Sequence, residues 1–189
     1  MRSDALLKRS QIITAAMDHY RTRPASLVTL EGIAADAGVG IATLYRHFPS
    51  RASLRQACAL GFIERFEEFL QATITDFDAD PEAMWARFVL TLADYGVGML
   101  AGALAEELPN AVDGQVRAQH DRFFADLEML LGKAAVNKLV SPAQTPMEFA
   151  AELVVATRPM DDHYTALFPD VRERLVRHLL TAWRTEAAA

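Results

Sequence analysis

Residues 41–47, IATLYRH, combine two kinds of side chain that suit the edges of DNA bases. Arg46 and Tyr45 are long hydrogen-bonding groups, and an arginine can make a bidentate contact to guanine. Ile41 and Ala42 are small and apolar, so we expect them to touch thymine methyl groups. Two alternatives stay open, because Arg46 also suits a phosphate and Tyr45 also suits a half-buried position.

Such contacts require a short rigid helix that projects from the protein, and the preceding residues supply its support. Thr29 is a plausible N-cap for a helix at 30–37, whose spacing places apolar residues on one inner face. Gly38 suits the left-handed position after that helix, and Val39 fills the angle before the next helix at 41–47. Two short helices joined by a glycine turn are typical of a helix-turn-helix DNA-binding module.

Two longer helices flank this module. The first is expected at 4–22, where apolar residues recur at helical spacing, and Pro24 ends it. The other begins after Ser50, a suitable cap, and runs to about Ile74.

With these residues in place, the N-terminal segment resembles the TetR family of transcriptional regulators. The resemblance covers about residues 8–60. The matching elements are Ile12-Ile13, Ala15-Ala16, Thr29, Ile33-Ala34, Ala37-Gly38-Val39, Thr43-Leu44-Tyr45-Arg46-His47-Phe48, Pro49-Ser50-Arg51 and Leu54. Many relatives carry Ser where Gly40 stands and Gly where Ala42 stands, so the resemblance does not settle which operator bases are read.

The resemblance adds phosphate contacts to the base contacts. Thr43 and His47 are similar to the family's phosphate-contacting positions. Thr29 and Arg51 lie at expected helix N-termini, where backbone N–H groups favour an anion. The predicted DNA-binding set is Thr29, Gly40, Ile41, Ala42, Thr43, Tyr45, Arg46, His47 and Arg51.

Composition and charge are consistent with a DNA-binding head on an acidic body. The chain has 189 residues, 51% of them hydrophobic, and favours an all-α fold of about nine helices. Residues 1–55 carry eight Lys and Arg against four Asp and Glu, although the whole chain has a formal charge of −6. The rest of the chain is acidic, so it repels DNA phosphates and disfavours binding of DNA to the wrong face of the protein. One cysteine, Cys58, excludes an intrachain disulfide, and without a long apolar run we expect a cytoplasmic protein.

Three segments are expected along the chain: a DNA-binding domain at 1–50, a connecting helix at 51–75, and a ligand-binding and dimerisation domain at 76–189. The polar stretch from Asp76 to Pro81 is interpreted as a charged linker. Further helices are predicted at about 81–95, 97–107, 113–135, 146–158 and 169–186.

The resemblance implies a small-molecule pocket in the C-terminal domain and pairing of the last two helices with a second subunit. Aromatic, methionine and histidine side chains are candidate pocket residues for a largely apolar effector, or plain core: Trp85, Phe88, Tyr95, Met99, His120, Phe123 and Phe124. Apolar stripes predict a dimer interface at Phe149, Leu153, Val154, Leu175, Leu179 and Trp183. Gly96, Gly98 and Gly102 permit either a helix shift or close packing.

Enzymatic and metal chemistry lack the required patterns. Asp76, Asp78 and Asp80 imitate a calcium loop, but Pro81 and Arg87 stand where glycine and glutamate are needed. No nucleophile elbow or phosphate loop occurs, so neither an enzyme nor a cofactor is expected. The sequence predicts a homodimeric repressor that a small molecule releases from double-stranded operator DNA. An activator, or a helical ligand-binding protein of the same fold that does not repress, remains the alternative.

Overall fold

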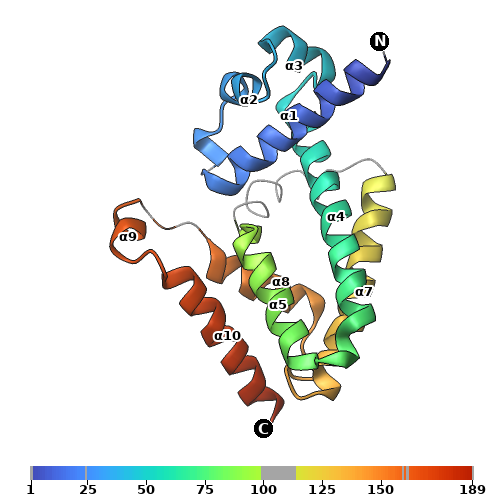
Figure 1. Cartoon of the computed structure of the whole chain (residues 1–189), viewed down its shortest axis with the longest axis vertical. Coiled ribbons are helices and arrows are strands. Elements are labelled where there is room, and N and C mark those ends of the chain that lie inside the picture. The colour runs from blue at the N-terminus through green and yellow to red at the C-terminus, as the bar shows by residue number, and fades with distance from the viewer. Residues whose placement is uncertain (1, 24, 99–113, 159, 161, 189) are drawn as a thin grey trace.

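The computed structural model describes residues 2–23, 25–98, 114–158, 160 and 162–188. Over these residues it contains nine α-helices, two short 3-10 helices and no β-strand, so the all-α prediction is confirmed. Three N-terminal helices form a head at one end of the molecule, and the remaining helices form a body below it (Figure 1). A single long helix, α4 (Arg51–Asp76), runs from the head into the body.

The head consists of α1 (Arg2–Thr22), a 3-10 turn (Ala25–Leu27), α2 (Leu30–Asp36) and α3 (Ile41–His47). Its apolar faces pack together with the first turns of α4 into one hydrophobic cluster that includes Ile12, Tyr20, Ile33 and Leu54, none of which is exposed to solvent. The helix bounds agree with the predicted ones to within about two residues.

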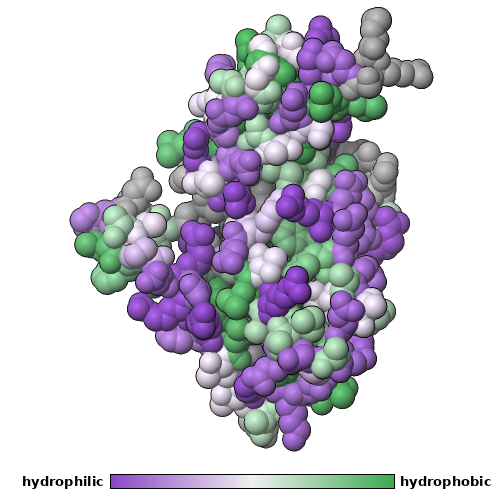
Figure 2. All heavy atoms as spheres, in the orientation of Figure 1, coloured by the Kyte–Doolittle hydropathy of each residue, from purple (hydrophilic) through white to green (hydrophobic). Residues whose placement is uncertain are grey.

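The body consists of α5 (Pro81–Asp94), α7 (Gly114–Val136), α8 (Pro146–Thr157), α9 (Asp162–Leu167) and α10 (Val171–Ala187). A second hydrophobic cluster joins the lower part of α4 to α5, α7, α8 and α10. The outer faces of α4 and α7 are mostly hydrophilic, as Figure 2 shows. Each half of the molecule therefore has a core of its own, and α4 contributes to both.

Two elements differ from the prediction. The stretch interpreted as a charged linker forms a 3-10 helix (Phe77–Ala79), and Phe77 is fully buried in the body's cluster. Asp80 caps α5 by accepting from the N–H of Ala83 at 3.0 Å. Helix α9 was not predicted, because six residues are too few to show helical periodicity. Of the helix predicted at 97–107, only Val97 and Gly98 lie within the described residues, and both are helical.

Candidate nucleic-acid interface

The outer face of α3 carries the side chains predicted to reach DNA bases. Tyr45 is 47% exposed and Ile41 37% exposed, and Ala42 and Arg46 are also exposed. On the opposite face, Leu44 is completely buried in the head's cluster. Helix α3 therefore projects as a ridge at the end of the molecule farthest from the C-terminus (Figure 1).

The turn before α3 fixes the direction of this ridge. Gly38 adopts φ 65°, a left-handed conformation that glycine enters without strain. The N–H groups of Gly38 and Val39 donate to the carbonyls of Ala35 and Ala34, which satisfies the C-terminus of α2. Gly40 is the N-cap of α3 and provides no side-chain hydrogen bond, and its carbonyl accepts from the N–H of Thr43 at 2.8 Å.

Two predicted phosphate contacts have structural partners in the head. Thr29 caps α2, because its Oγ1 accepts from the N–H of Gly32 at 3.1 Å. Arg51 donates from Nη1 to the carbonyl of Val28 at 2.9 Å, which ties the start of α4 to the start of α2. Thr43 and His47 are half-buried at the edge of the ridge, beside the exposed face.

A buried histidine that sequence reasoning missed locks α1 to α2. His19 is 3% exposed, and its Nε2 lies 2.6 Å from Oδ2 of Asp36. Its Nδ1 lies 3.2 Å from Nη1 of Arg23. Since a guanidinium only donates, Nδ1 accepts and Nε2 carries the proton that Asp36 accepts. Helix spacing gives no signal for a pair 17 residues apart, so the sequence could not reveal it.

The same histidine explains the glycine at the third position of α2. A Cβ at Gly32 would lie 3.0 Å from Oγ1 of Thr29 and 3.1 Å from Cε1 of His19. The glutamate or glutamine of a capping box therefore has little room here, and Thr29 caps the helix alone.

Tyr95 forms a joint between head and body and packs against both hydrophobic clusters. The guanidinium of Arg21, at the end of α1, lies 5.7 Å from its ring centre, and that of Arg65 in α4 lies 5.1 Å away. Its ring also meets Phe66 edge-on at 4.9 Å. Tyr95, predicted as a pocket residue, thus links α5 to α1 and α4.

Close packing explains two of the three glycines that follow α5. Gly96 has φ 75°, and a Cβ there would lie 2.8 Å from Cγ of Arg21. A Cβ at Gly98 would lie 2.5 Å from Oγ1 of Thr157 and 2.7 Å from the carbonyl oxygen of Val154. Gly102 lies outside the described residues.

The predicted pocket residues do not form one group. Phe88 is completely buried and stacks on Phe69 and Phe149, so it belongs to the hydrophobic core of the body. Trp85 is 2% exposed and is also core, although it borders a surface pocket described below.

The remaining pocket candidates lie in α7 or outside the described residues. His120 stacks on Phe124 at 4.5 Å, and Phe124 meets Phe123 edge-on at 6.0 Å. All three are half-buried. Met99 lies outside the described residues. The effector site predicted for this set is therefore still a prediction.

Half of the predicted dimer residues are likewise core. Phe149, Leu153 and Trp183 are each 1% exposed, so the protomer itself covers them and they offer no surface to a partner. Leu175 is 43% exposed, and Leu179 and Val154 are half-buried. An apolar groove of about 560 Å³ runs between α8 and α10. Its lining residues are Ala151, Glu152, Val155, Ala156, Leu175, His178, Leu179 and Ala182.

Three further findings concern chemistry. Burial raises the pKa of the Cys58 thiol to about 12, so the group remains a thiol in the core, with no sign of a reactive thiolate. Over the described ranges, no group of three or more metal-ligating side chains comes together. Within those ranges, too, every helix is too short or too polar to cross a bilayer.

An outward ridge on α3 behind a glycine turn defines a helix-turn-helix DNA-binding protein. Residues 12–58 match the family model described as "Bacterial regulatory proteins, tetR family". The chain is 26% identical to a nucleoid occlusion factor SlmA of Marinomonas sp. over 83% of its length and 82% of the relative's. A nucleoid occlusion factor SlmA of Shewanella amazonensis is 32% identical over 47% of this chain and 43% of its own. Among solved structures, the regulatory protein TetR of Rhodobacter sphaeroides has a TM-score of 0.66, is 19% identical, and matches 95% of this chain and 98% of its own.

Residues 12–58 carry a DNA-binding region of the TetR family of bacterial regulatory proteins, as the resemblance predicted. Members of this family are DNA-binding regulators and not enzymes. The match to the family model ends at residue 58, so it covers the head and the first turns of α4. The solved structure extends the likeness of fold over the body.

Proposed function

We propose that this protein is a homodimeric repressor that a small-molecule ligand releases from its operator. Residues 1–50 read DNA, residues 51–75 connect, and residues 76–189 bind the ligand and pair with a second subunit. The observation that carries the proposal is the outer face of α3, where Tyr45 and Arg46 are exposed while Leu44 on the inner face is fully buried. A ridge of this kind fits the major groove, with its first residues toward base edges.

The groove between α8 and α10 supports the pairing. Val155 is 67% exposed and Leu175 43% exposed beside it, an apolar surface that a second copy would remove from water. Tyr164 and Leu167 in α9, and Phe168 directly after it, are further exposed apolar residues, and Figure 2 shows hydrophobic residues on the protruding helix. Two paired copies present two α3 ridges to half-sites about 34–36 Å apart, or a multiple of that distance.

The joint at Tyr95 supports the response to a ligand. A ligand changes DNA affinity only as far as it binds one arrangement of the head and body more tightly than another. Arg21 and Arg65 stack on Tyr95 from two different helices, so a shift of α5 would be felt at the end of α1 and along α4. This contact gives the body a physical route to the head.

Binding to the intergenic DNA upstream of the protein's own gene tests the DNA-reading half. We expect a saturable anisotropy change at low salt that weakens steeply as salt rises, because arginines displace counterions from phosphates. Arg46→Ala should lose about 1–3 kcal/mol of binding free energy. Arg87→Ala removes an exposed arginine from α5 and should bind like the unmodified protein. Equal losses in both variants would contradict the proposal.

A role in nucleoid occlusion is the second candidate, because the match to the factor of Marinomonas sp. spans most of both chains. Genome-wide occupancy together with transcript levels in a deletion strain separates the two. A repressor occupies a few promoters, and the adjacent transcripts rise on deletion. A nucleoid-wide factor occupies many dispersed sites and leaves the adjacent transcripts unchanged. Native mass spectrometry of the purified protein tests for a retained small molecule.

A further inference from the structure

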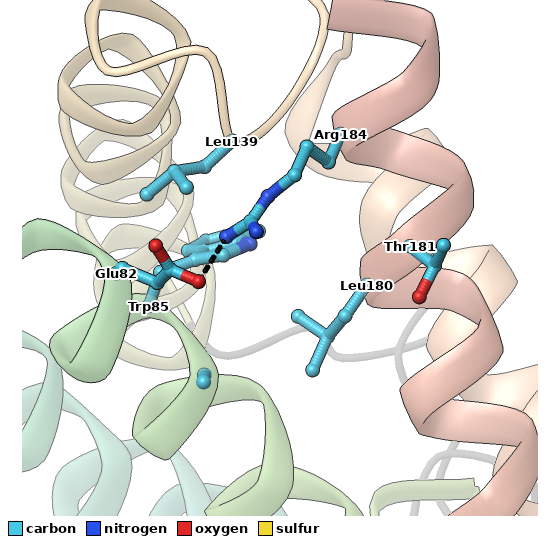
Figure 3. Close-up of a pocket in the computed structure, with 7 residues that line it drawn as sticks. Glu82, Trp85, Leu139, Leu180, Thr181 and Arg184 are labelled. Carbon is cyan, nitrogen blue, oxygen red and sulfur yellow. Dashed lines mark ion pairs between the residues drawn. The ribbon is translucent and has the colours of Figure 1, made fainter.

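A pocket of about 220 Å³ lies at the end of the body farthest from α3, between the first turns of α5 and the last turns of α10 (Figures 1 and 3). Trp85, Leu139 and Leu180 provide its apolar surface. Glu82 and Arg184 form an ion pair of 2.7 Å across it, from α5 to α10. The pocket combines an apolar interior with a single cation at its edge.

The indole of Trp85 has an unused hydrogen-bond donor at this pocket. Trp85 is 2% exposed, and its Nε1 is buried without a hydrogen-bond partner. The neighbouring Trp183, whose ring lies 6.0 Å from that of Trp85, does have a hydrogen-bond partner. Its Nε1 donates to Oε2 of Glu152 at 2.5 Å. Buried indole N–H groups usually have an acceptor. Figure 3 shows Trp85 lining the pocket together with Glu82 and Arg184.

We propose that this pocket binds a small organic carboxylate. The carboxylate would replace Glu82 at the guanidinium of Arg184, whose fork matches two carboxylate oxygens, and would also accept from Nε1 of Trp85. Glu82 is 69% exposed and can turn into water, and an exposed ion pair of this kind contributes little stability. Leu139 and Leu180 would contact the apolar part of the ligand.

The size and charge of the pocket narrow the ligand class. Its volume is below the ~300–1,000 Å³ of pockets for drug-sized ligands, so the ligand is small. One guanidinium suits a singly charged group better than a phosphate. A short branched or aromatic monocarboxylate fits both conditions.

Isothermal titration of the full chain with sodium benzoate tests the proposal. We expect saturable binding with a Kd of about 1 mM or tighter. Benzyl alcohol, which lacks the charge, should bind at least about tenfold more weakly, and so should inorganic phosphate. Absence of saturable benzoate binding would overturn the proposal. Equal binding of benzyl alcohol would overturn it as well, because the pocket would then recognise only the apolar body.

Variants locate the binding site. Glu82→Gln should tighten benzoate binding by about two- to fivefold, because the competing carboxylate is gone. Arg184→Gln should weaken it at least about tenfold. Trp85→Phe retains an apolar surface without the donor and should weaken it about threefold or more.

The matched control is Glu173→Gln. Glu173 pairs with Arg177 at 2.6 Å on the same helix, α10, but neither residue lines the pocket. This variant should bind benzoate like the unmodified protein. If Glu82→Gln and Arg184→Gln both bind as the unmodified protein does, benzoate binds elsewhere and the assignment to this pocket is wrong. None of these measurements uses DNA, so they are independent of the proposed regulatory function.

Discussion

A substitution at Gly38 tests the turn that orients α3, because it changes only the energy of the left-handed backbone conformation. Its φ is 65°, and no heavy atom lies within 4 Å of the position that a Cβ would occupy. Gly38→Ala therefore introduces no clash. It forces an L-residue into the left-handed region, which costs about 1–2 kcal/mol. Gly38→Asn should cost less, since asparagine enters this region more readily.

Gly132 is the matched control. It lies in α7 and is exposed, and a Cβ there would also meet no atom within 4 Å. Because it occupies a helix, Gly132→Ala should stabilise the protein by about 1 kcal/mol. The same chemical change thus has opposite signs at the two sites. Urea unfolding followed by circular dichroism measures both, with unchanged slope expected.

Two results would refute this reasoning. One is a Gly38→Ala variant as stable as the unmodified protein, which would mean that the turn adopts another conformation. The other is an equal loss at Gly132, which would mean that the added methyl group and not the backbone angle sets the cost. The affinity of the Gly38→Ala variant for DNA, measured at a low urea concentration, should decrease together with the stability of the head, because the turn orients α3.

Three further predictions follow from other parts of the molecule. Asp36→Ala leaves the buried Nε2–H of His19 without its acceptor and should destabilise the head by about 1–3 kcal/mol in urea unfolding, whereas Asp36→Asn retains an acceptor and should cost less. If the proposed dimer forms through the groove between α8 and α10, Val155→Glu should shift sedimentation toward the monomer, whereas Val136→Glu, at an 84% exposed position in the last turn of α7, should not. Cys58 ionises near 9.0 when unfolded but near 12 when folded, so the free energy of unfolding should fall by up to about 1.4 kcal/mol per pH unit between those values. Cys58→Ala should reduce that slope, and an unchanged slope would contradict the assigned pKa.

Local chemistry made the head predictable from sequence. The residue type of Gly38 indicates a turn, and Thr29 and Ser50 indicate the starts of helices. Leu44 and Phe48 lie four residues apart, as one face of a helix requires. Each signal acts over a few residues, so the helix bounds could be predicted from sequence, whereas the exposed position of Tyr45 was one of two alternatives. Ser50 caps α4 as predicted, and the side chain of Ser53 completes a capping box with it.

Contacts between distant residues were not predictable in the same way. His19 and Asp36 meet because α1 crosses α2, and Tyr95 meets Arg21 because α5 ends beside α1. The sequence around each of these residues gives no sign of which helices lie next to each other. The pocket at Trp85 likewise depends on how the last turns of α10 approach α5.

Helix α10 shows how the predicted dimer residues divide between the protomer's core and its surface. Trp183 and Leu175 lie eight residues apart, and a single apolar stripe connects them in the sequence. In the fold, Trp183 is 1% exposed and Leu175 43% exposed. Both residues are apolar, and hydrophobicity alone does not distinguish burial by the same chain from burial by another copy. The tryptophan carries a second signal, because its N–H needs a partner and finds Glu152 within the protomer. A polar atom on an apolar side chain therefore helps to report which surface closes over that side chain.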